Sequence, residues 1–411
     1  MTDPVAHVAG PVRAALDRLA GDLPALGIAV SGGGDSMALM HIVADWSHGR
    51  RVMVATVDHN LRAESAEEAR QVGRAARTLD LPHTTLNWHR DTGSGNLMAA
   101  AREARFRLLS EWAQANRLPA IALGHTADDQ AETLMMRLAR GSGIDGLAAM
   151  AECRDAFGVR WLRPMLGARR EDLRDWLRGR DIAWIDDPGN ENVDFDRIRI
   201  RKAIAAMGLE TAALARSARH IGEARRALSH YAADTAERAV IRHGTITLPR
   251  RDFRDAPAEI RRRLLVASCR WITGADYPPR RATVLHALEA IGAGSRVTLD
   301  GALIEPIGDR LHIGREPAAA MRAQISDGPE WDNRWRVDGL RPGQQVSALG
   351  MQALAQVNWR GAGLSRDDAA ASPAIRESGR LIAAPLLRGG SGHRVEPLRD
   401  AADFRKLVMA H

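Results

Sequence analysis

Residues 31–36 read SGGGDS, with three consecutive glycines between two serines and an aspartate beside them. An apolar run precedes the stretch and a run of helical period follows it, so the glycines lie between a predicted strand and a predicted helix. Such a turn offers free backbone N–H groups and the positive end of the helix dipole to an anion. The lysine of a Walker A loop and the glycine spacing of a dinucleotide fingerprint are both missing. The stretch therefore predicts a phosphate site of another kind; glycines that serve only a tight turn are the alternative.

A second polar segment, GHTADDQAET at residues 124–133, opens another predicted helix. Thr126 and Asp129 form a capping pattern, while Asp128 and Glu132 are four apart and share a face near the helix start. Carboxylates beside a nucleotide can hold Mg²⁺ or position a cationic amine. Acidic residues are also common at helix starts for electrostatic reasons alone, so the segment by itself leaves both interpretations open.

Basic residues supply the opposite charge in two places. Arg102 and Arg105 are three apart on a predicted helix, so they share a face and can clamp a phosphate or a carboxylate; a solvated basic stripe is the alternative. A loop predicted from DDPGN at residues 186–190 leads into the basic stretch FDRIRIR at residues 195–201. A weaker motif, VDHNLR at residues 57–62, ends a predicted strand.

Alternating strands and helices must position these motifs in the first part of the chain. Strands are expected at residues 26–30, 51–57, 83–88, 120–124 and 159–164, and helices at residues 36–46, 65–79, 97–116 and 128–140. This alternation predicts an α/β fold with a parallel sheet covered on both faces. Ligands of such sheets bind beyond the carboxyl ends of the strands, which is where the polar motifs fall.

After about residue 210 the pattern changes to arginine-rich helices and short strands. Helices are expected at residues 211–240 and 250–272, an antiparallel unit at 295–317, and a small mixed region or loose tail from 327 onward. A chain of 411 residues is too long for one ordinary core, so two or three domains are expected.

Composition narrows the class of protein. No apolar run is long enough to span a membrane and the N-terminus lacks the pattern of a secretory signal, so we expect a cytoplasmic protein. Two distant cysteines, Cys153 and Cys269, exclude a disulfide framework or a cysteine zinc site and are expected in the core. The net charge of +7, carried almost wholly by arginine, favours a nucleic-acid partner, although GC-rich codons would also enrich arginine.

The SGGGDS turn resembles the pyrophosphate loop of the N-type ATP pyrophosphatases of the PP-loop superfamily. Taken in order with VDHNLR, NLMAAAREARF, GHTADDQAET, RGSGIDGLAAM and FDRIRIR, it is similar to the tRNA(Ile)-lysidine synthetase family over residues 25–205. The resemblance implies an N-terminal PP-loop domain, adenine nucleotide alpha hydrolase-like and Rossmann-like, at residues 1–208. It also implies a mainly helical, tRNA-binding domain with a small antiparallel β unit at 209–325 and a small region for the tRNA acceptor stem at 326–411.

The reaction implied by the resemblance uses ATP and Mg²⁺ to adenylate the wobble cytidine of a tRNA(Ile) with a CAU anticodon. Free lysine then replaces AMP at C2 of the base, which gives lysidine and changes codon reading from AUG to AUA. No obligate protein partner and no membrane are implied. The alternatives are a PP-loop tRNA thiolase of the 2-thiocytidine type, which the lack of a CxxC motif disfavours, and a non-catalytic protein that binds ATP and RNA.

Residue roles carry over by the same resemblance. The ATP-binding residues are Ser31, Gly32, Gly33, Gly34, Asp35, Ser36, Val57, Asp58, His59, Arg140 and Gly141. The catalytic residues are Asp35, Arg105, Asp128, Asp129 and Glu132, of which Asp35 and Asp128 are the expected Mg²⁺ ligands. The residues that bind the tRNA substrate are Arg102, Arg105, Arg197 and Arg201. Three positions depart from the family pattern: Thr126 replaces a frequent histidine, Gly189 a serine and Ile198 an asparagine.

Overall fold

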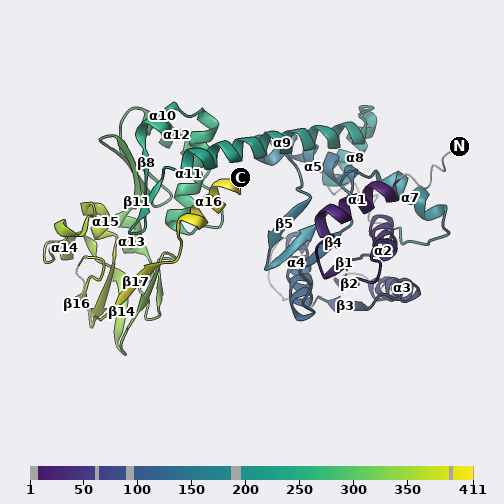
Figure 1. Ribbon diagram of the computed structural model, residues 1–411, viewed down its shortest axis with the longest axis horizontal. Helices are drawn as coiled ribbons and strands as arrows, with labels where there is room; N and C mark the ends of the chain where they lie inside the picture. The colour runs from purple at the N-terminus through teal and green to yellow at the C-terminus, as the bar shows by residue number, and fades with distance from the viewer. Residues whose placement is uncertain (1–7, 61–63, 89–96, 187–195, 388–391, 411) are drawn as a thin grey trace. The chain divides into compact units, whose positions relative to one another are not determined.

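The computed structural model describes residues 8–60, 64–88, 97–186, 196–387 and 392–410. The chain forms two compact units, residues 1–223 and 224–411 (Figure 1). Within the described ranges no helix is long and apolar enough to cross a membrane.

The first unit is built on one six-stranded sheet. Its strands are β1 (Ala25–Ala29), β2 (Arg51–Asp58), β3 (His83–Asn87), β4 (Ala120–Leu123), β5 (Cys153–Ala156) and β6 (Val159–Leu162), in the spatial order β3-β2-β1-β4-β6-β5. The first five strands of this order are parallel, which confirms the predicted sheet, whereas β5 pairs antiparallel with β6 at the edge and was not predicted. The chain moves outward from β1 to β3 and then returns to place β4 on the other side of β1. The carboxyl ends of β1 and β4 therefore lie side by side where the strand order reverses, the usual ligand position in such sheets.

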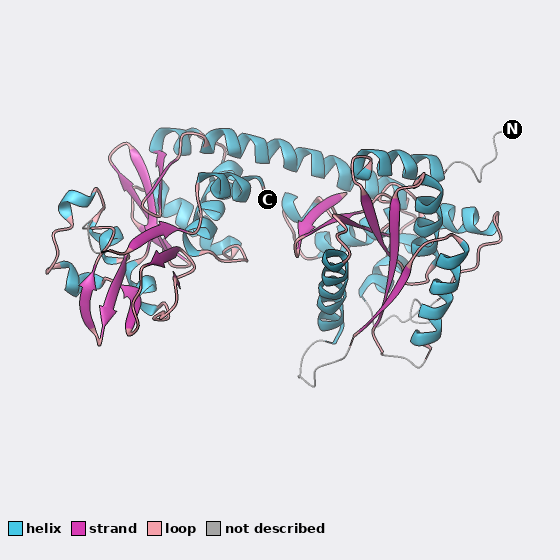
Figure 2. Cartoon of the chain, turned by 60° about the horizontal axis from the view of Figure 1, so that its bottom comes forward, coloured by secondary structure: helices cyan, strands magenta, loops and turns pink. Residues whose placement is uncertain are grey.

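Helices cover both faces of this sheet, as Figure 2 shows. The helices of this part of the chain are α1 (Ala9–Ala20), α2 (Gly34–Trp46), α3 (Ser65–Thr78), α4 (Leu97–Ala115), α5 (Ala127–Ala139), α6 (Ile144–Leu147), α7 (Arg170–Arg178) and α8 (Asp196–Ala206), followed by α9 (Thr211–Ala236). The predictions for α2, α3, α4 and α5 are confirmed to within two residues at each end. Helices α1 and α7 were not predicted.

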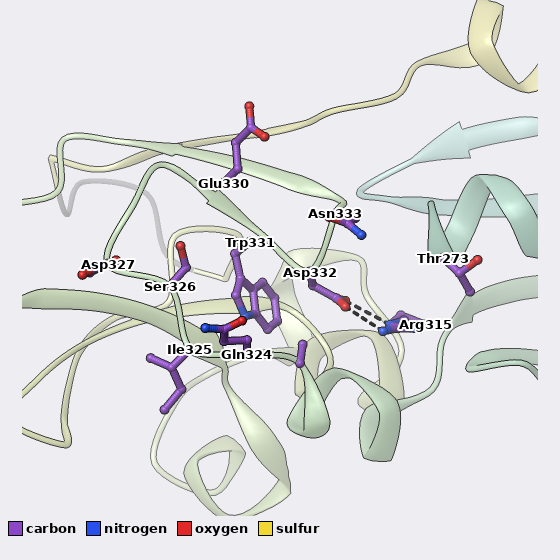
Figure 3. Close-up of a pocket in the computed structure, with 11 residues that line it drawn as sticks. Thr273, Arg315, Gln324, Ile325, Ser326, Asp327, Glu330, Trp331, Asp332 and Asn333 are labelled. Atoms are coloured by element: carbon purple, nitrogen blue, oxygen red, sulfur yellow. Dashed lines mark hydrogen bonds and ion pairs between the residues drawn. The ribbon is translucent and has the colours of Figure 1, made fainter. Parts of the chain in front are cut away.

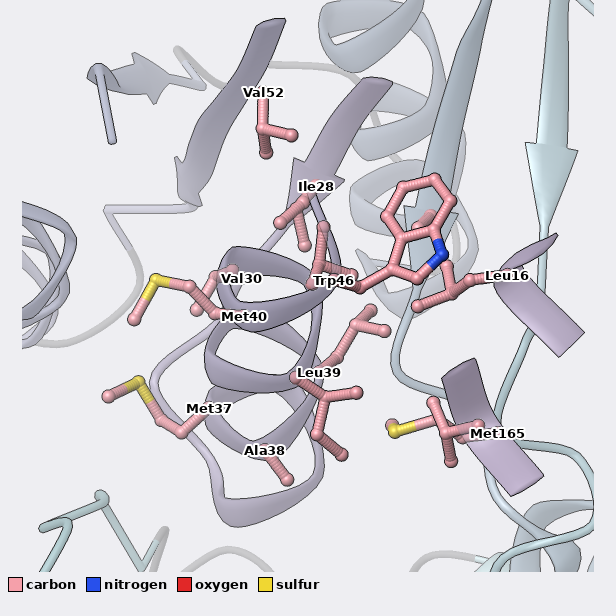
Figure 4. Packing of buried hydrophobic residues seen from close by; sticks show 14 of the residues in the cluster. Leu16, Ile28, Val30, Met37, Ala38, Leu39, Met40, Trp46, Val52 and Met165 are labelled. Atoms are coloured by element: carbon pink, nitrogen blue, oxygen red, sulfur yellow. The ribbon is translucent and has the colours of Figure 1, made fainter. Parts of the chain in front are cut away.

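The main core of the first unit lies under α2. Helices α1, α2, α3 and α7 pack with the sheet residues Ile28 and Val54 in one apolar cluster, and α4 packs on the opposite face through Leu109 and Trp112. Figure 4 shows Leu39 of α2 within the first cluster, where it is fully buried. Because α2 is buried on several sides, its first turn, which carries the glycines, is held in a fixed place.

The second unit begins with a five-stranded antiparallel sheet and its helices. Its elements are β7 (Val240–Arg242), β8 (Thr245–Pro249), α10 (Arg250–Asp255), α11 (Ala258–Thr273), α12 (Arg281–Gly292), β9 (Val297–Leu299), β10 (Ala302–Ile307), β11 (Arg310–Arg315) and α13 (Pro317–Arg322). The strand order is β7-β8-β11-β10-β9, so the predicted antiparallel unit is present and is larger than expected. The single helix expected at 250–272 is wrong: Pro257 holds Ala256 in an extended conformation and splits it into α10 and α11.

The last part of the second unit holds two three-stranded sheets. Its elements are β12 (Glu330–Trp331), β13 (Trp335–Asp338), β14 (Gln344–Ala348), α14 (Gly350–Leu354), α15 (Arg366–Ala370), β15 (Pro373–Glu377), β16 (Arg380–Ala383), β17 (Arg394–Pro397) and α16 (Ala401–Met409). Helix α16 packs against α11 through Phe404 and Val408. A cavity of about 500 Å³ lies in this unit, and Arg315 and Asp332 in its lining pair at 2.6 Å. Figure 3 shows this pair among the residues that line the cavity.

The two cysteines divide between surface and core. Cys269 is buried in α11, as predicted, and burial raises the pKa of its thiol to about 12. Cys153 is exposed on the edge strand β5, so its predicted place in the core is wrong.

Leu39→Ala tests how much the core under α2 contributes to stability. The substitution leaves a cavity at a fully buried site, and we expect it to lower the free energy of unfolding of the first unit by about 2–5 kcal/mol. Urea unfolding followed by circular dichroism measures the loss. Leu138→Ala is the matched control in the same unit, because Leu138 of α5 is 54% exposed; equal losses in the two variants would contradict the assignment of the core.

Candidate active site

The glycine turn joins the end of β1 to the start of α2. Gly33 is the N-cap residue of α2 and provides no side-chain cap, so the first N–H groups of the helix are left to face a ligand. The Ser36 hydroxyl donates to the carbonyl of Gly33 at 2.9 Å and accepts the N–H of Ser31 at 3.1 Å. These hydrogen bonds fix the turn from within, and the geometry suits the phosphate site predicted from residues 31–36.

Two neighbouring segments hold the turn from outside. Gly32 has a φ of +92° and a Cβ there would lie 2.5 Å from Cδ1 of Ile185, whose N–H donates to the Gly32 carbonyl. On the other side, a Cβ on Gly124 would lie 3.1 Å from Cα of Ser36. The absence of a side chain at Gly124 therefore lets the end of β4 come close to the turn and brings the start of α5 beside it.

The start of α5 carries the predicted acidic residues. Thr126 and Asp129 form the predicted capping box, with Oδ2 of Asp129 accepting the Thr126 N–H at 2.8 Å. Asp128 projects toward α7, and its Oδ2 accepts the N–H of Arg170 at 2.7 Å. Glu132, one turn further, is only 2% exposed. The carboxylate of Asp128 thereby caps the start of α7 and places the Arg170 side chain.

Arg170 joins the two predicted parts of the site. Its Nε donates to Oδ2 of Asp35 at 2.9 Å, while its two terminal nitrogens lie 3.4 Å from Oδ1 of Asp129 and 3.5 Å from Oε1 of Glu132. Arg201 of α8 also pairs with Oε1 of Glu132, at 2.8 Å. The aspartate of the glycine turn and the acids of α5 thus meet at one guanidinium group.

The pKa values of Asp35 and Asp129 shift in opposite directions, because burial and the contacts with Arg170 contribute differently to each. Burial raises the pKa of Asp35 above its ordinary value, and Arg170 only partly opposes this shift. Burial also acts on Asp129, but there Arg170 and the hydrogen bonds from Thr126 outweigh it, so the pKa of Asp129 falls below its ordinary value. The pKa of Arg170 rises because its carboxylate neighbours outweigh the effect of its burial.

Two carboxylate oxygens of this group are buried and have no hydrogen-bond partner among the described residues. They are Oδ1 of Asp35 and Oε2 of Glu132. A buried carboxylate oxygen without a donor is costly, so both oxygens fit a cationic ligand such as Mg²⁺ or an ammonium group. Within the described ranges, no three His, Cys, Asp or Glu side chains converge as a ready metal site. This pattern suits Mg²⁺, which usually takes one or two carboxylates and completes its shell with phosphates and water.

Basic side chains gather around His125, next to the acidic group formed by Asp35, Asp129 and Glu132. Arg163 donates to Nδ1 of His125 at 3.3 Å, which leaves the imidazole proton on Nε2. Burial lowers the pKa of His125 to about 3, and the nearby Arg105 and Arg197 act in the same direction. Burial and the neighbouring Arg197 likewise lower the pKa of Arg102. Of the predicted substrate arginines, Arg105 and Arg197 therefore lie near His125, Arg102 lies near Arg197, and Arg201 pairs with Glu132 instead.

The remaining predicted residues fall into three groups. Asp58 is buried at the end of β2 and accepts the N–H of Asn60 at 2.8 Å, which forms a turn that carries His59. Val57 is half-buried against α4. Arg140 and Gly141 are exposed at the end of α5, where Arg140 pairs with Asp196.

Two of the three positions that depart from the family pattern, Thr126 and Ile198, lie within the described residues, and Thr126 caps α5. Ile198 is buried in α8 at 7% exposure, so the position fills the core here. Arg62, Asn96, Gly189 and Phe195 of the quoted motifs lie outside the described residues.

Sequence reasoning missed Arg170, His125 and Arg163 as members of the site. His125 stands inside the quoted GHTADDQAET motif and could have been found there. Arg170 is one of two adjacent arginines in RPMLGARRED, residues 163–172, and no local pattern distinguishes it from Arg169. Only the fold shows that one of the two turns toward the carboxylates.

A cavity of about 350 Å³ adjoins the acidic group. It is lined by Asp128, Arg169, Glu171, Glu210, Thr211 and Ala212. Its lining is therefore predominantly acidic and polar.

Comparison with known proteins gives a consistent result. A family model described as a PP-loop domain matches residues 12–207. The chain is 44% identical over 395 residues to the tRNA(Ile)-lysidine synthase of Ruegeria pomeroyi, covering 94% of both chains. It is 39% identical to the protein of the same name from Bradyrhizobium diazoefficiens, covering 72% of this chain and 91% of the relative. For the Rhodopseudomonas palustris protein of that name the identity is 40%, over 74% and 93% of the two chains.

The match to the Ruegeria protein extends along nearly the whole chain and includes both units, and the PP-loop domain contains the glycine turn and the acidic group described above. The PP-loop domain also makes the protein a user of ATP. The chain therefore belongs to the tRNA(Ile)-lysidine synthase family of enzymes.

Proposed function

We propose that the protein joins free lysine to C2 of the wobble cytidine of a tRNA(Ile) with a CAU anticodon, at the expense of ATP. The observation that carries this proposal is the meeting of Asp35 with Asp129 and Glu132 at Arg170. This contact supports the proposal, because a reaction that first adenylates a base and then adds an amine needs a phosphate site and carboxylates close together, and one arginine joins the glycine turn to the acids of α5.

In the first step, the C2 carbonyl oxygen of the cytidine attacks the α-phosphorus of ATP and pyrophosphate leaves. The N–H groups at the start of α2 hold the departing pyrophosphate, and the hydroxyl of Ser31 adds a donor, while Ser36 fixes the turn through its bond to the Gly33 carbonyl. Mg²⁺, held by Asp35 and the phosphates, would neutralise charge on the leaving group. Adenylation turns a poor leaving oxygen into a good one.

In the second step, an amine of lysine attacks C2 and AMP leaves. The amine must lose a proton to become a nucleophile, and the carboxylate of Glu132 accepts it. The acidic cavity beside Asp128 suits a substrate that carries two ammonium groups. Glu132 is the better candidate to contact the amine, since its Oε2 has no partner among the described residues.

Arginines on the substrate side bind the tRNA in this proposal. Arg105 and Arg197 lie near His125, and Arg102 lies near Arg197. All three can pair with phosphates of the anticodon loop, while the second unit supplies further contacts, including the acceptor stem. A wobble base in a single-stranded loop can be turned out of its stack at low cost. Binding through phosphates weakens as salt concentration rises.

Incorporation of labelled lysine tests the proposed reaction. With ATP and Mg²⁺, the full chain should transfer radioactive lysine to a tRNA(Ile) transcript with a CAU anticodon and leave elongator tRNA(Met) unlabelled. Asp35→Ala should abolish transfer, because it removes the carboxylate that the glycine turn contributes to the site. Label in neither tRNA, from folded protein that binds ATP, would reject lysidine formation and direct attention to thiolation or to binding alone.

Gly32→Ala tests the conformation of the glycine turn. A φ of +92° is strained for any residue with a side chain, and a methyl group would also push against Cδ1 of Ile185, so the turn must distort and its N–H groups lose their alignment. We expect the Kd for ATP, measured by calorimetry, to rise about tenfold or more, equivalent to about 1.4 kcal/mol. Gly167→Ala is the control, because a Cβ there meets no atom within 4 Å; equal ATP affinity in the two variants would refute the role of the turn.

A further inference from the structure

Arg170 contacts three carboxylates that come from two different elements. Asp35 belongs to the glycine turn, and Asp129 and Glu132 belong to α5. The three nitrogens of the guanidinium group each face a different carboxylate, and the backbone N–H of Arg170 is itself held by Asp128. The side chain is only 18% exposed. Its position is therefore determined from both ends, unlike that of a surface ion pair.

Each carboxylate meets Arg170 through one oxygen only. Asp35 uses Oδ2 and Glu132 uses Oε1, and the second oxygen of each is buried without a partner among the described residues. The second oxygen of Asp129 is already occupied by Thr126. The guanidinium thus orients the acids so that two oxygens, one from the turn and one from α5, stay available to a ligand.

Charge explains why a cation is built in at this place. The three carboxylates are balanced by Arg170 and Arg201, which leaves one net negative charge; without Arg170 the group would carry two. A buried acidic group with two net negative charges would attract divalent cations strongly. Arginine suits this place because it stays charged at every working pH and its planar fork reaches several carboxylates at once.

We propose that Arg170 is a positioning residue that serves as a built-in counter-cation of the acidic group. It orients Asp35 and Glu132 and prevents the group from holding a free divalent cation before ATP arrives with one. This inference rests on the proposed function, because it assigns Arg170 a part in the same site.

The test measures free cation binding and turnover in the full-length Arg170→Met variant. Mn²⁺ serves as the probe and is followed by electron paramagnetic resonance at constant pH without ATP. We expect Mn²⁺ to bind about tenfold tighter or more than to the wild type, because one positive charge beside a divalent ion is gone. At saturating substrates the kcat for lysine transfer should fall about hundredfold, because the acids lose their orientation. The KM for ATP should change by less than about threefold, because the N–H groups of the turn remain.

Two further variants separate charge from simple loss of structure. Arg170→Lys keeps the charge without the fork, so Mn²⁺ binding should stay within about threefold of the wild type while kcat is partly restored. Arg74→Met is the control in the first unit, where Arg74 of α3 pairs with the exposed Glu67 away from the site; both measurements should match the wild type. If Arg170→Met does not fold, Arg170→Lys carries the test, and a tenfold rise in its Mn²⁺ affinity would refute the proposal.

The outcomes distinguish this inference from the proposed function. Unchanged or weaker Mn²⁺ binding in Arg170→Met would overturn the counter-cation, since a purely structural salt bridge predicts loss of binding as the site collapses. An unchanged kcat would overturn the positioning role. Tighter Mn²⁺ binding in Arg170→Met, together with no lysine transfer by the wild type, would support the counter-cation and reject lysidine formation.

Discussion

Three carboxylates share a largely buried corner of this protein because guanidinium groups lie among them. Removing an ion from water costs several kcal/mol, and the ion pairs with Arg170 and Arg201 offset part of that cost for Asp129 and Glu132. These ion pairs link parts of the chain that are far apart in sequence. They join the turn after β1 and the helix after β4 to Arg170 at the start of α7 and Arg201 in α8, so the site forms only when all four parts are in place.

The sheet topology brings these parts within reach. Since the strand order reverses between β1 and β4, the two following turns emerge side by side and point the same way. Helix α7 then packs in the same apolar cluster as α2, through Leu173 and Trp176, with its first residue directed at the acids. The apolar packing under α2 therefore determines where the charged groups meet, although none of the residues in that packing takes part in chemistry.

Much of this arrangement could be predicted from the sequence, for reasons that lie in local patterns. The parallel strands, the phosphate-binding turn and the capping box at Thr126 and Asp129 each have a short signature in which neighbouring residues determine the structure. Arg170 has none, because its partners lie 41 and 135 residues away. Pro257, which separates α10 from α11, is also a local signal. It was overlooked because the apolar periodicity of residues 250–272 suggested one continuous helix. The exposure of Cys153 follows from the edge hairpin of β5 and β6, and such pairings depend on the finished sheet.

The close approach of Gly124 to Ser36 has a consequence for the cost of binding ATP. With the end of β4 packed close to Ser36 on one side, and Ile185 packed beside Gly32 and bonded to its carbonyl on the other, the turn is restricted in the conformations that it can adopt. A flexible glycine loop would lose conformational entropy when it closes around a phosphate. This turn has already lost that entropy during folding, so more of the energy of its contacts with the nucleotide remains available as affinity.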